Sequence, residues 1–172
     1  MVDTSAGEYE TFVRSRTPAL LRSAYLLTGD QHLAEDLVQT ALARTHRAWS
    51  RLRQTGNAEA YTRKTMYHLQ VSWWRRPRVA ESSREVPERS SGPDPSDQVA
   101  IRTTLRQALL RLTPSQRAVL VLRYFEDRSE VETAELLSVS VGTVKSQTAR
   151  ALGRIRKVAP ELADLNLVGG NS

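Results

Sequence analysis

A stretch rich in proline and serine divides this 172-residue chain and limits what it can fold into. Residues 77–97, PRVAESSREVPERSSGPDPSD, hold four of the seven prolines, five serines and almost no large apolar side chains. Proline stops helices, and the small and charged side chains offer little surface to bury. We therefore expect a flexible linker there, between one small domain at residues 1–76 and another at residues 98–172.

Helical periodicity is the main pattern of the first part. Its first helix has apolar residues at Leu20, Leu21, Ala24 and Tyr25 and ends at the break TGD, residues 28–30. Asp30 is suited to cap a second helix, whose apolar positions are Leu33, Leu37, Val38, Ala41, Leu42 and Trp49. After a loop at residues 51–58, Asn57 can cap a third helix that contains Tyr61, Leu69 and Trp73 and ends by Pro77.

The second part also has helical signals and no competing strand pattern. Its first helix has apolar residues at Ile101, Leu105, Ala108, Leu109 and Leu112. TPSQ at residues 113–116 and SEVE at residues 129–132 are capping boxes, the first with proline at the first helical position. The run RAVLVLRYF after the first box is apolar on nearly every side, as in a central helix covered by its neighbours. The whole chain is therefore predicted to be all-α.

Residues 129–157 have the length pattern of a helix-turn-helix: a helix at 129–137, a turn at 138–140 and a helix from Val141. Ala134 suits the close approach of the two helices, and Leu137, Val139 and Val144 supply apolar contacts that fix their crossing. Ser138 stands where a turn glycine is usual, and it must accept a conformation that glycine adopts more easily.

The second helix of this motif indicates DNA binding in the major groove. Its outward face carries Thr143, Lys145, Ser146, Gln147, Arg150 and Arg154. Residues 136–160 contain no acid, and the chain has a net charge of +6, which favours a polyanionic partner. Lysine or arginine can donate to guanine, and Gln147 can pair with adenine. A solvent-exposed basic helix without a ligand is the alternative.

Several function classes have no support in the sequence. There is no cysteine, and the histidines His32, His46 and His68 are scattered without metal-ligand spacing or a catalytic constellation. We therefore expect neither an enzyme nor a metal or cofactor site. The N-terminus lacks the features of a signal peptide, and no apolar run is long enough to insert into a membrane, so the expected compartment is the cytoplasm.

Both parts resemble the same protein family. Residues 110–156, LRLTPSQRAVLVLRYFEDRSEVETAELLSVSVGTVKSQTARALGRIR, resemble region 4 of bacterial RNA polymerase sigma factors of the extracytoplasmic-function (ECF) type. LLTGDQHLAEDLVQTALARTHRAW at 26–49 and AYTRKTMYHLQVSWWRR at 60–76 resemble region 2. The resemblance implies a cytoplasmic, nucleoid-associated sigma factor that binds core RNA polymerase, directs it to promoter DNA and helps to initiate transcription.

The resemblance also implies a task for each part. Region 4 would read the minus-35 duplex and meet the flap of the second-largest polymerase subunit. Region 2 would bind the clamp helices of the largest subunit through Glu35, Asp36 and Gln39, although these carboxylates also suit a helix N-terminus. The melted minus-10 strand would be captured by Arg53, Gly56, Asn57, Arg63, Lys64, Trp74, Arg75 and Arg76. An anti-sigma factor is a further partner that the family allows.

A stand-alone helix-turn-helix regulator is the other interpretation. In that case the first domain would sense a ligand or dimerise. It accounts for residues 113–157 equally well, but not for the order of an acidic helix and a basic helix in the first part or for the arginine-rich end SWWRRPR.

Overall fold

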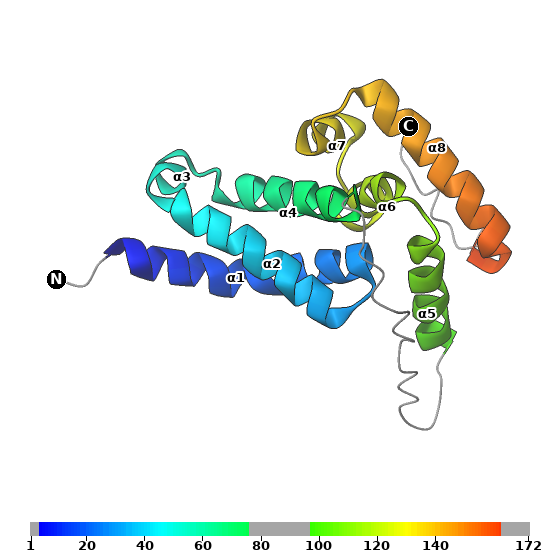
Figure 1. Ribbon diagram of the computed structural model, residues 1–172, viewed down its shortest axis with the longest axis horizontal. Coiled ribbons are helices and arrows are strands. Elements are labelled where there is room, and N and C mark those ends of the chain that lie inside the picture. The colour runs from blue at the N-terminus through cyan, green and yellow to red at the C-terminus, as the bar shows by residue number, and fades with distance from the viewer. Residues whose placement is uncertain (1–3, 76–96, 163–172) are drawn as a thin grey trace.

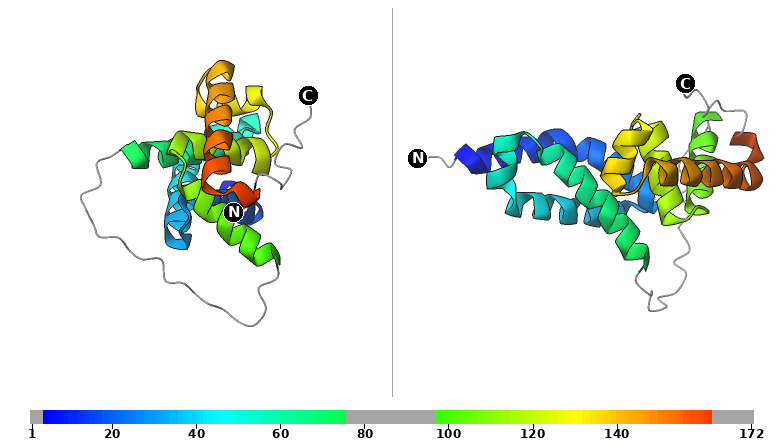
Figure 2. Two further views of the ribbon diagram at one scale, coloured as in Figure 1. Left: turned by 90° about the vertical axis from the view of Figure 1, so that its right-hand side faces the viewer. Right: turned by 90° about the horizontal axis from the view of Figure 1, so that it is seen from above.

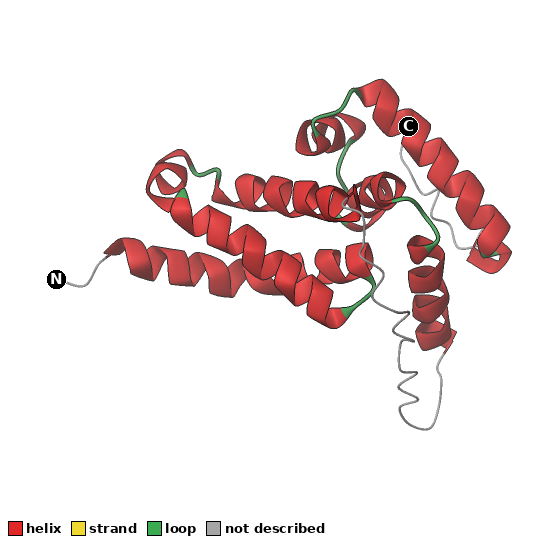
Figure 3. Ribbon diagram, viewed as in Figure 1, coloured by secondary structure: helices red, strands yellow, loops and turns green. Residues whose placement is uncertain are grey.

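The structure, a computed structural model, describes residues 4–75 and 97–162. These residues form helices and short connections, with no strand among them, as Figures 1 and 3 show. The all-α prediction is thus confirmed. Residues 77–96 of the predicted linker lie outside the described ranges, and Asp97 already begins a helix.

Three long helices build the first half: α1 (Thr4–Thr28), α2 (Gln31–Arg47) and α4 (Ala58–Arg75), joined by the short α3 (Trp49–Thr55). Figure 1 shows α2 running back along α1 and α4 lying beside α2. Gly29, with φ 69°, allows the tight turn after α1. Asp30 then caps α2 as predicted, since its side chain accepts from the Leu33 N–H at 2.9 Å.

Two sequence predictions for this half were wrong. The second helix ends at Arg47, and Trp49 belongs to α3, which extends to Thr55 through most of the predicted loop. The cause is local packing, because Trp49 and Leu52 form a buried cluster with Ala58, against which Tyr9 and Phe12 of α1 pack. Tyr25 and Leu33 were expected in the core, but 38% and 41% of their surfaces are exposed.

The second half contains α5 (Asp97–Leu110), α6 (Pro114–Leu120), α7 (Glu130–Leu137) and α8 (Val141–Val158). Both predicted capping boxes are present, at the starts of α6 and α7. The apolar run continues beyond α6 as a π-helical turn, η1 (Val121–Phe125), and a 3-10 turn, η2 (Pro160–Leu162), follows α8. Ile101 of α5, expected in the core, is 38% exposed.

One hydrophobic core extends across both halves. Leu20 and Leu27 of α1 and Met66 of α4 belong to the same buried cluster as Val121 and Leu122 of η1. A second cluster unites α5, α6 and α8 around Leu109 and Ile155. In Figure 2 the second half accordingly sits against one end of the first-half bundle. The core therefore places α4 beside α7 and the start of the helix-turn-helix.

Candidate nucleic-acid interface

The helix-turn-helix is formed by α7 and α8, and its geometry follows from buried small and branched residues. Ala134 and Val144 pack with Val119 of α6 in a buried cluster, so the close approach predicted at Ala134 is observed. Ser138 adopts the left-handed conformation, with φ 55°, that its place in the turn predicts. Val139 was expected to fix the helix crossing, but it is 39% exposed because the turn directs it outward.

The predicted recognition helix α8 presents a polar face opposite its buried one. Val144, Ala151 and Ile155 are buried, whereas Arg150 and Arg154 are exposed. Ser140 caps the helix and accepts from the Thr143 N–H at 3.1 Å, so the first turn is fixed. This arrangement leaves the basic side chains free of the protein core and within reach of a groove.

Individual predicted contacts of α8 differ in how available they are. The hydroxyl of Thr143 lies 2.9 Å from that of Ser140, and Ser146 donates to the Thr143 carbonyl at 3.1 Å, so both hydroxyls have local partners. Lys145 Nζ lies 3.7 Å from Glu130 Oε2 on α7, and 64% of the lysine side chain is exposed. Gln147 is partly buried.

In the first half, the predicted strand-binding residues lie at the α3–α4 turn and along α4. Gly56 has φ 68°, and Asn57 and Lys64 are exposed. Arg53 Nη1 lies 3.1 Å from Glu8 Oε2 of α1. Trp74 and Arg75 lie in α4, but their side chains, and all of Arg76, are outside what the structure describes.

An open pocket of about 800 Å³ adjoins this turn, between α1, α3 and α4. Its apolar walls include Phe12, Trp49 and Leu52, and Arg16 and Arg53 contribute cations at its edge. The contribution of α1 was not predicted. The sequence feature that could have indicated it is the aromatic pair Tyr9 and Phe12. These rings contact Trp49 only once α1 and α2 have folded against each other.

Arg63 does not lie where its predicted role requires. It was expected on an exposed basic face, but it is 9% exposed and lies between two carboxylates. Its Nε is 3.3 Å from Glu59 Oε1, and its Nη1 is 2.8 Å from Glu126 Oε1 of the second half. In this arrangement the guanidinium is not available to a nucleic acid.

The predicted polymerase-binding residues lie in the N-terminal part of α2. Asp36 and Gln39 are exposed, and Glu35 is partly buried. Glu35 accepts from Gln31 Nε2 at 3.1 Å, an interaction within the helix. These side chains leave an acidic and amide face that a partner could cover.

Sequence reasoning missed two buried polar residues that join the halves. Arg117 is 1% exposed and donates to the carbonyls of Leu109 and Leu112 in the second half and of Leu27 at the end of α1. Burial lowers the pKa of Arg117 to about 10. The other residue is Glu126. The burial of Arg117 could have been predicted from its place as a charged residue at the start of an apolar run. No local sequence pattern sets Glu126 apart from the exposed acidic residues.

Metal sites and membrane-spanning helices are both absent from the described ranges. Residues 4–75 and 97–162 contain no group of three or more histidine, aspartate or glutamate side chains placed to hold a metal ion. None of the helices found there combines the length and apolar character needed to cross a membrane.

Comparison with known proteins assigns a family to both halves. Residues 12–79 match the model of Sigma-70 region 2, and residues 102–155 match that of Sigma-70, region 4. The RNA polymerase sigma-E factor of Streptomyces coelicolor is 44% identical over 150 residues, which cover 87% of this chain and 85% of that protein. The ECF RNA polymerase sigma factor SigM of Mycobacterium tuberculosis is 28% identical over 87% of this chain and 76% of that protein.

A solved structure shows the same fold. The sigma factor RpoE of Bartonella quintana, in complex with the anti-sigma factor NepR, matches 88% of this chain and 96% of its own with a TM-score of 0.60 and 23% identity. These relatives are sigma factors rather than stand-alone regulators. The chain therefore belongs to the bacterial RNA polymerase sigma factors of the ECF type, with sigma-70 regions 2 and 4.

Proposed function

We propose that this chain binds core RNA polymerase in the cytoplasm, directs it to promoters and initiates transcription without catalysing a reaction itself. The observation that carries the proposal is that the exposed basic helix α8 lies in a half that matches Sigma-70 region 4, while the other half matches Sigma-70 region 2. A stand-alone regulator would use the first half to sense a ligand or to dimerise, whereas this half matches Sigma-70 region 2.

The helix α8 is proposed to read the minus-35 element as duplex. Lys145 and Arg150 are exposed and Gln147 is partly buried on the N-terminal part of α8, where a recognition helix meets base edges. Each good base contact contributes about 1–3 kcal/mol of discrimination, so a few contacts suffice to choose among promoters. Arg154, one turn beyond Arg150, is placed to contact a phosphate instead.

The α3–α4 turn is proposed to capture the unpaired minus-10 strand. Gly56 and Asn57 allow a close backbone approach, and the adjoining pocket offers the aromatic wall of Trp49 and Phe12 to an extruded base. Arg53 and Lys64 provide cations for the strand. Arg63, Trp74, Arg75 and Arg76 complete the set of residues predicted to bind it.

Protein partners follow from the remaining faces. The exposed face of α2 with Glu35, Asp36 and Gln39 is proposed to meet the clamp helices of the largest polymerase subunit. The second half is proposed to contact the flap of the second-largest subunit. The complex of the Bartonella quintana relative with an anti-sigma factor supports a partner of that class for this chain as well. Association with the nucleoid follows from promoter binding.

The test is run-off transcription with purified core polymerase and a library of promoter fragments. The chain should produce specific transcripts that core polymerase alone does not, and their absence would contradict the proposal. Arg150→Ala should lower the specific transcript by about 5- to 150-fold, which corresponds to the loss of one base contact. Arg102→Ala, at an exposed position of α5, is the matched control. Core-polymerase binding should be equal in both variants.

A further inference from the structure

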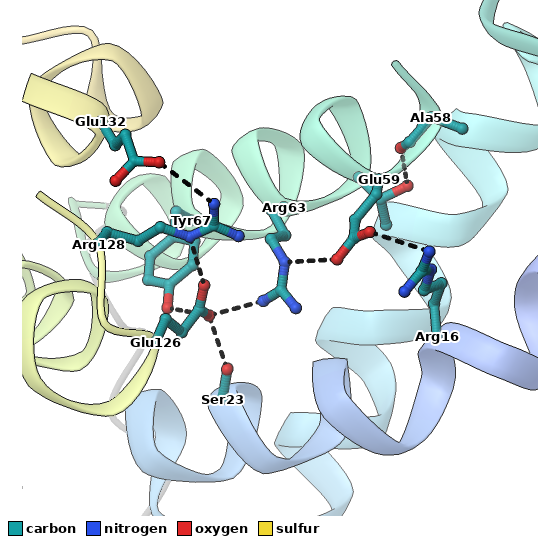
Figure 4. A network of polar contacts seen from close by, with 10 residues as sticks. Arg16, Ser23, Ala58, Glu59, Arg63, Tyr67, Glu126, Arg128 and Glu132 are labelled. Atoms are coloured by element: carbon teal, nitrogen blue, oxygen red, sulfur yellow. Dashed lines mark hydrogen bonds and ion pairs between the residues drawn. The ribbon is translucent and has the colours of Figure 1, made fainter. Parts of the chain in front are cut away.

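One carboxylate oxygen of the second half is contacted by three side chains of the first half, through two hydrogen bonds and one ion pair. Glu126 Oε1 lies 2.7 Å from Ser23 Oγ, 2.7 Å from the Tyr67 hydroxyl and 2.8 Å from Arg63 Nη1. Figure 4 shows these side chains converging from α1 and α4. The Glu126 side chain is only 7% exposed, so the cluster is shielded from solvent. Charge-assisted hydrogen bonds of this kind are among the stronger ones in proteins.

The backbone holds Glu126 in place for this contact. The π-turn η1 ends at Phe125, and the N–H of the next residue, Glu126, donates to the Val121 carbonyl at 2.9 Å. The chain then reverses at Asp127, with φ 53°, and the Arg128 N–H returns to the Leu122 carbonyl at 2.9 Å. Since Val121 and Leu122 are fully buried in the shared core, the backbone that carries Glu126 is fixed to that core in the closed chain.

Other contacts close the two halves around this cluster. His68 Nε2 on α4 donates to the Leu136 carbonyl of α7 at 3.1 Å. Arg106 of α5 donates to the Gly29 carbonyl at 3.2 Å. Thus α4, with its strand-binding positions, is in direct contact with the helix that precedes the recognition helix.

This closed arrangement conflicts with simultaneous binding to both promoter elements. The minus-35 and minus-10 elements lie roughly 25 base pairs apart, or about 85 Å along B-form DNA. Two halves whose helices are in hydrogen-bond contact cannot span that distance. The closed state must therefore open before both elements are engaged, a step that rests on the proposed function.

We propose that Glu126 acts as a latch that keeps the free chain closed by occupying Arg63, and that the promoter strand binds Arg63 only after this carboxylate has left. A phosphate oxygen carries the same charge as the carboxylate, so it can replace Glu126 as the ion-pair partner of the Arg63 guanidinium. Opening frees the basic surface of α4, whereas the recognition helix α8 is already exposed in the closed chain.

The latch is testable by distance measurement in the full chain, which has no native cysteine. Spin labels at Ala43→Cys of α2 and Val158→Cys of α8, both exposed, report the separation of the halves. The labelled chain that keeps Glu126 should give one short distance between the two spin labels. Glu126→Gln should raise the open population about 10- to 100-fold, which is the loss expected for charged hydrogen bonds. Glu135→Gln, an exposed acid on α7, is the control.

Ser23→Ala gives an independent check, because it removes one donor to Glu126 and leaves every charge in place. It should open the chain less than Glu126→Gln does, while circular dichroism shows both variants folded. The proposal would be overturned if the labelled chain with Glu126 and the labelled Glu126→Gln variant gave equal distance distributions. Run-off transcription keeps the two ideas apart: its failure in every variant refutes the proposed function, whereas unchanged distances alongside normal transcription refute the latch.

Discussion

Two glycines with the same backbone conformation provide a sharp test of the closed structure. Gly29 and Gly56 have φ 69° and 68°, so alanine is strained equally by the backbone at both positions. They differ in their surroundings. A Cβ at Gly29 would meet Leu110 of the second half, with its Cδ2 at 2.7 Å, whereas a Cβ at Gly56 meets nothing within 4 Å.

The magnitudes follow from these surroundings. Gly56→Ala should lower the free energy of unfolding by about 1 kcal/mol, the left-handed strain less the entropy that alanine removes from the unfolded chain. Gly29→Ala carries that cost and must also displace Leu110. Full burial of a leucine side chain contributes about 1.5–3 kcal/mol. Since Leu110 is 36% exposed, displacement adds about 1–2 kcal/mol and gives a total of about 2–3 kcal/mol.

Urea unfolding followed by circular dichroism measures both variants, and the original chain should unfold in one transition because its halves share a core. The decisive quantity is the difference between the two alanine variants. If Gly29→Ala costs no more than Gly56→Ala, Leu110 does not pack on Gly29 in solution and the closed arrangement is wrong.

Two further predictions concern Tyr67 and Ser138. Burial and the Glu126 carboxylate raise the pKa of Tyr67 well above 10, so its contribution to stability is present below pH 10 and is lost as the pH rises beyond it. Between about pH 9 and about pH 11, Tyr67→Phe should therefore lose less free energy of unfolding than the original chain, as measured by urea unfolding. Burial lowers the pKa of Arg117 to about 10, and this acts in the opposite direction, but it does so in both proteins and cancels in the comparison. Equal dependence of the free energy of unfolding on pH in the two proteins would contradict the prediction. Ser138→Gly should raise the free energy of unfolding by about 0.5–1 kcal/mol, because glycine adopts φ 55° without strain; an unchanged or lower melting temperature would argue against strain at this turn.

Local rules explain what the sequence predicted well. Asp30, Thr113, Ser129 and Ser140 each cap the helix that follows, because a cap depends only on residues within one turn. The helix-turn-helix was predictable for the same reason, since its turn length and the small Ala134 lie within a few residues of each other.

Contacts between distant segments explain what it did not predict. Tyr25 fits the core stripe of α1, yet it faces Arg106 of α5, whose Nη1 donates to its hydroxyl at 3.0 Å. Arg63 fits an exposed basic face until Glu126, 63 positions later, covers it. Helical periodicity reports which side of a helix is buried, and it carries no information about a polar partner from another part of the chain.

Two of the intramolecular ion pairs on predicted DNA contacts, Lys145 with Glu130 and Arg63 with Glu126, should therefore be unequal in effect. Lys145 and Glu130 are 3.7 Å apart and largely solvated, and such a pair contributes little against a phosphate. Arg63 and Glu126 are 2.8 Å apart, with side chains 10% and 7% exposed, so solvent screens their attraction far less. The recognition helix is consequently ready to bind DNA in the free chain, whereas the strand-binding helix is not. Duplex recognition can precede strand capture for this reason, since only the second step requires the halves to separate.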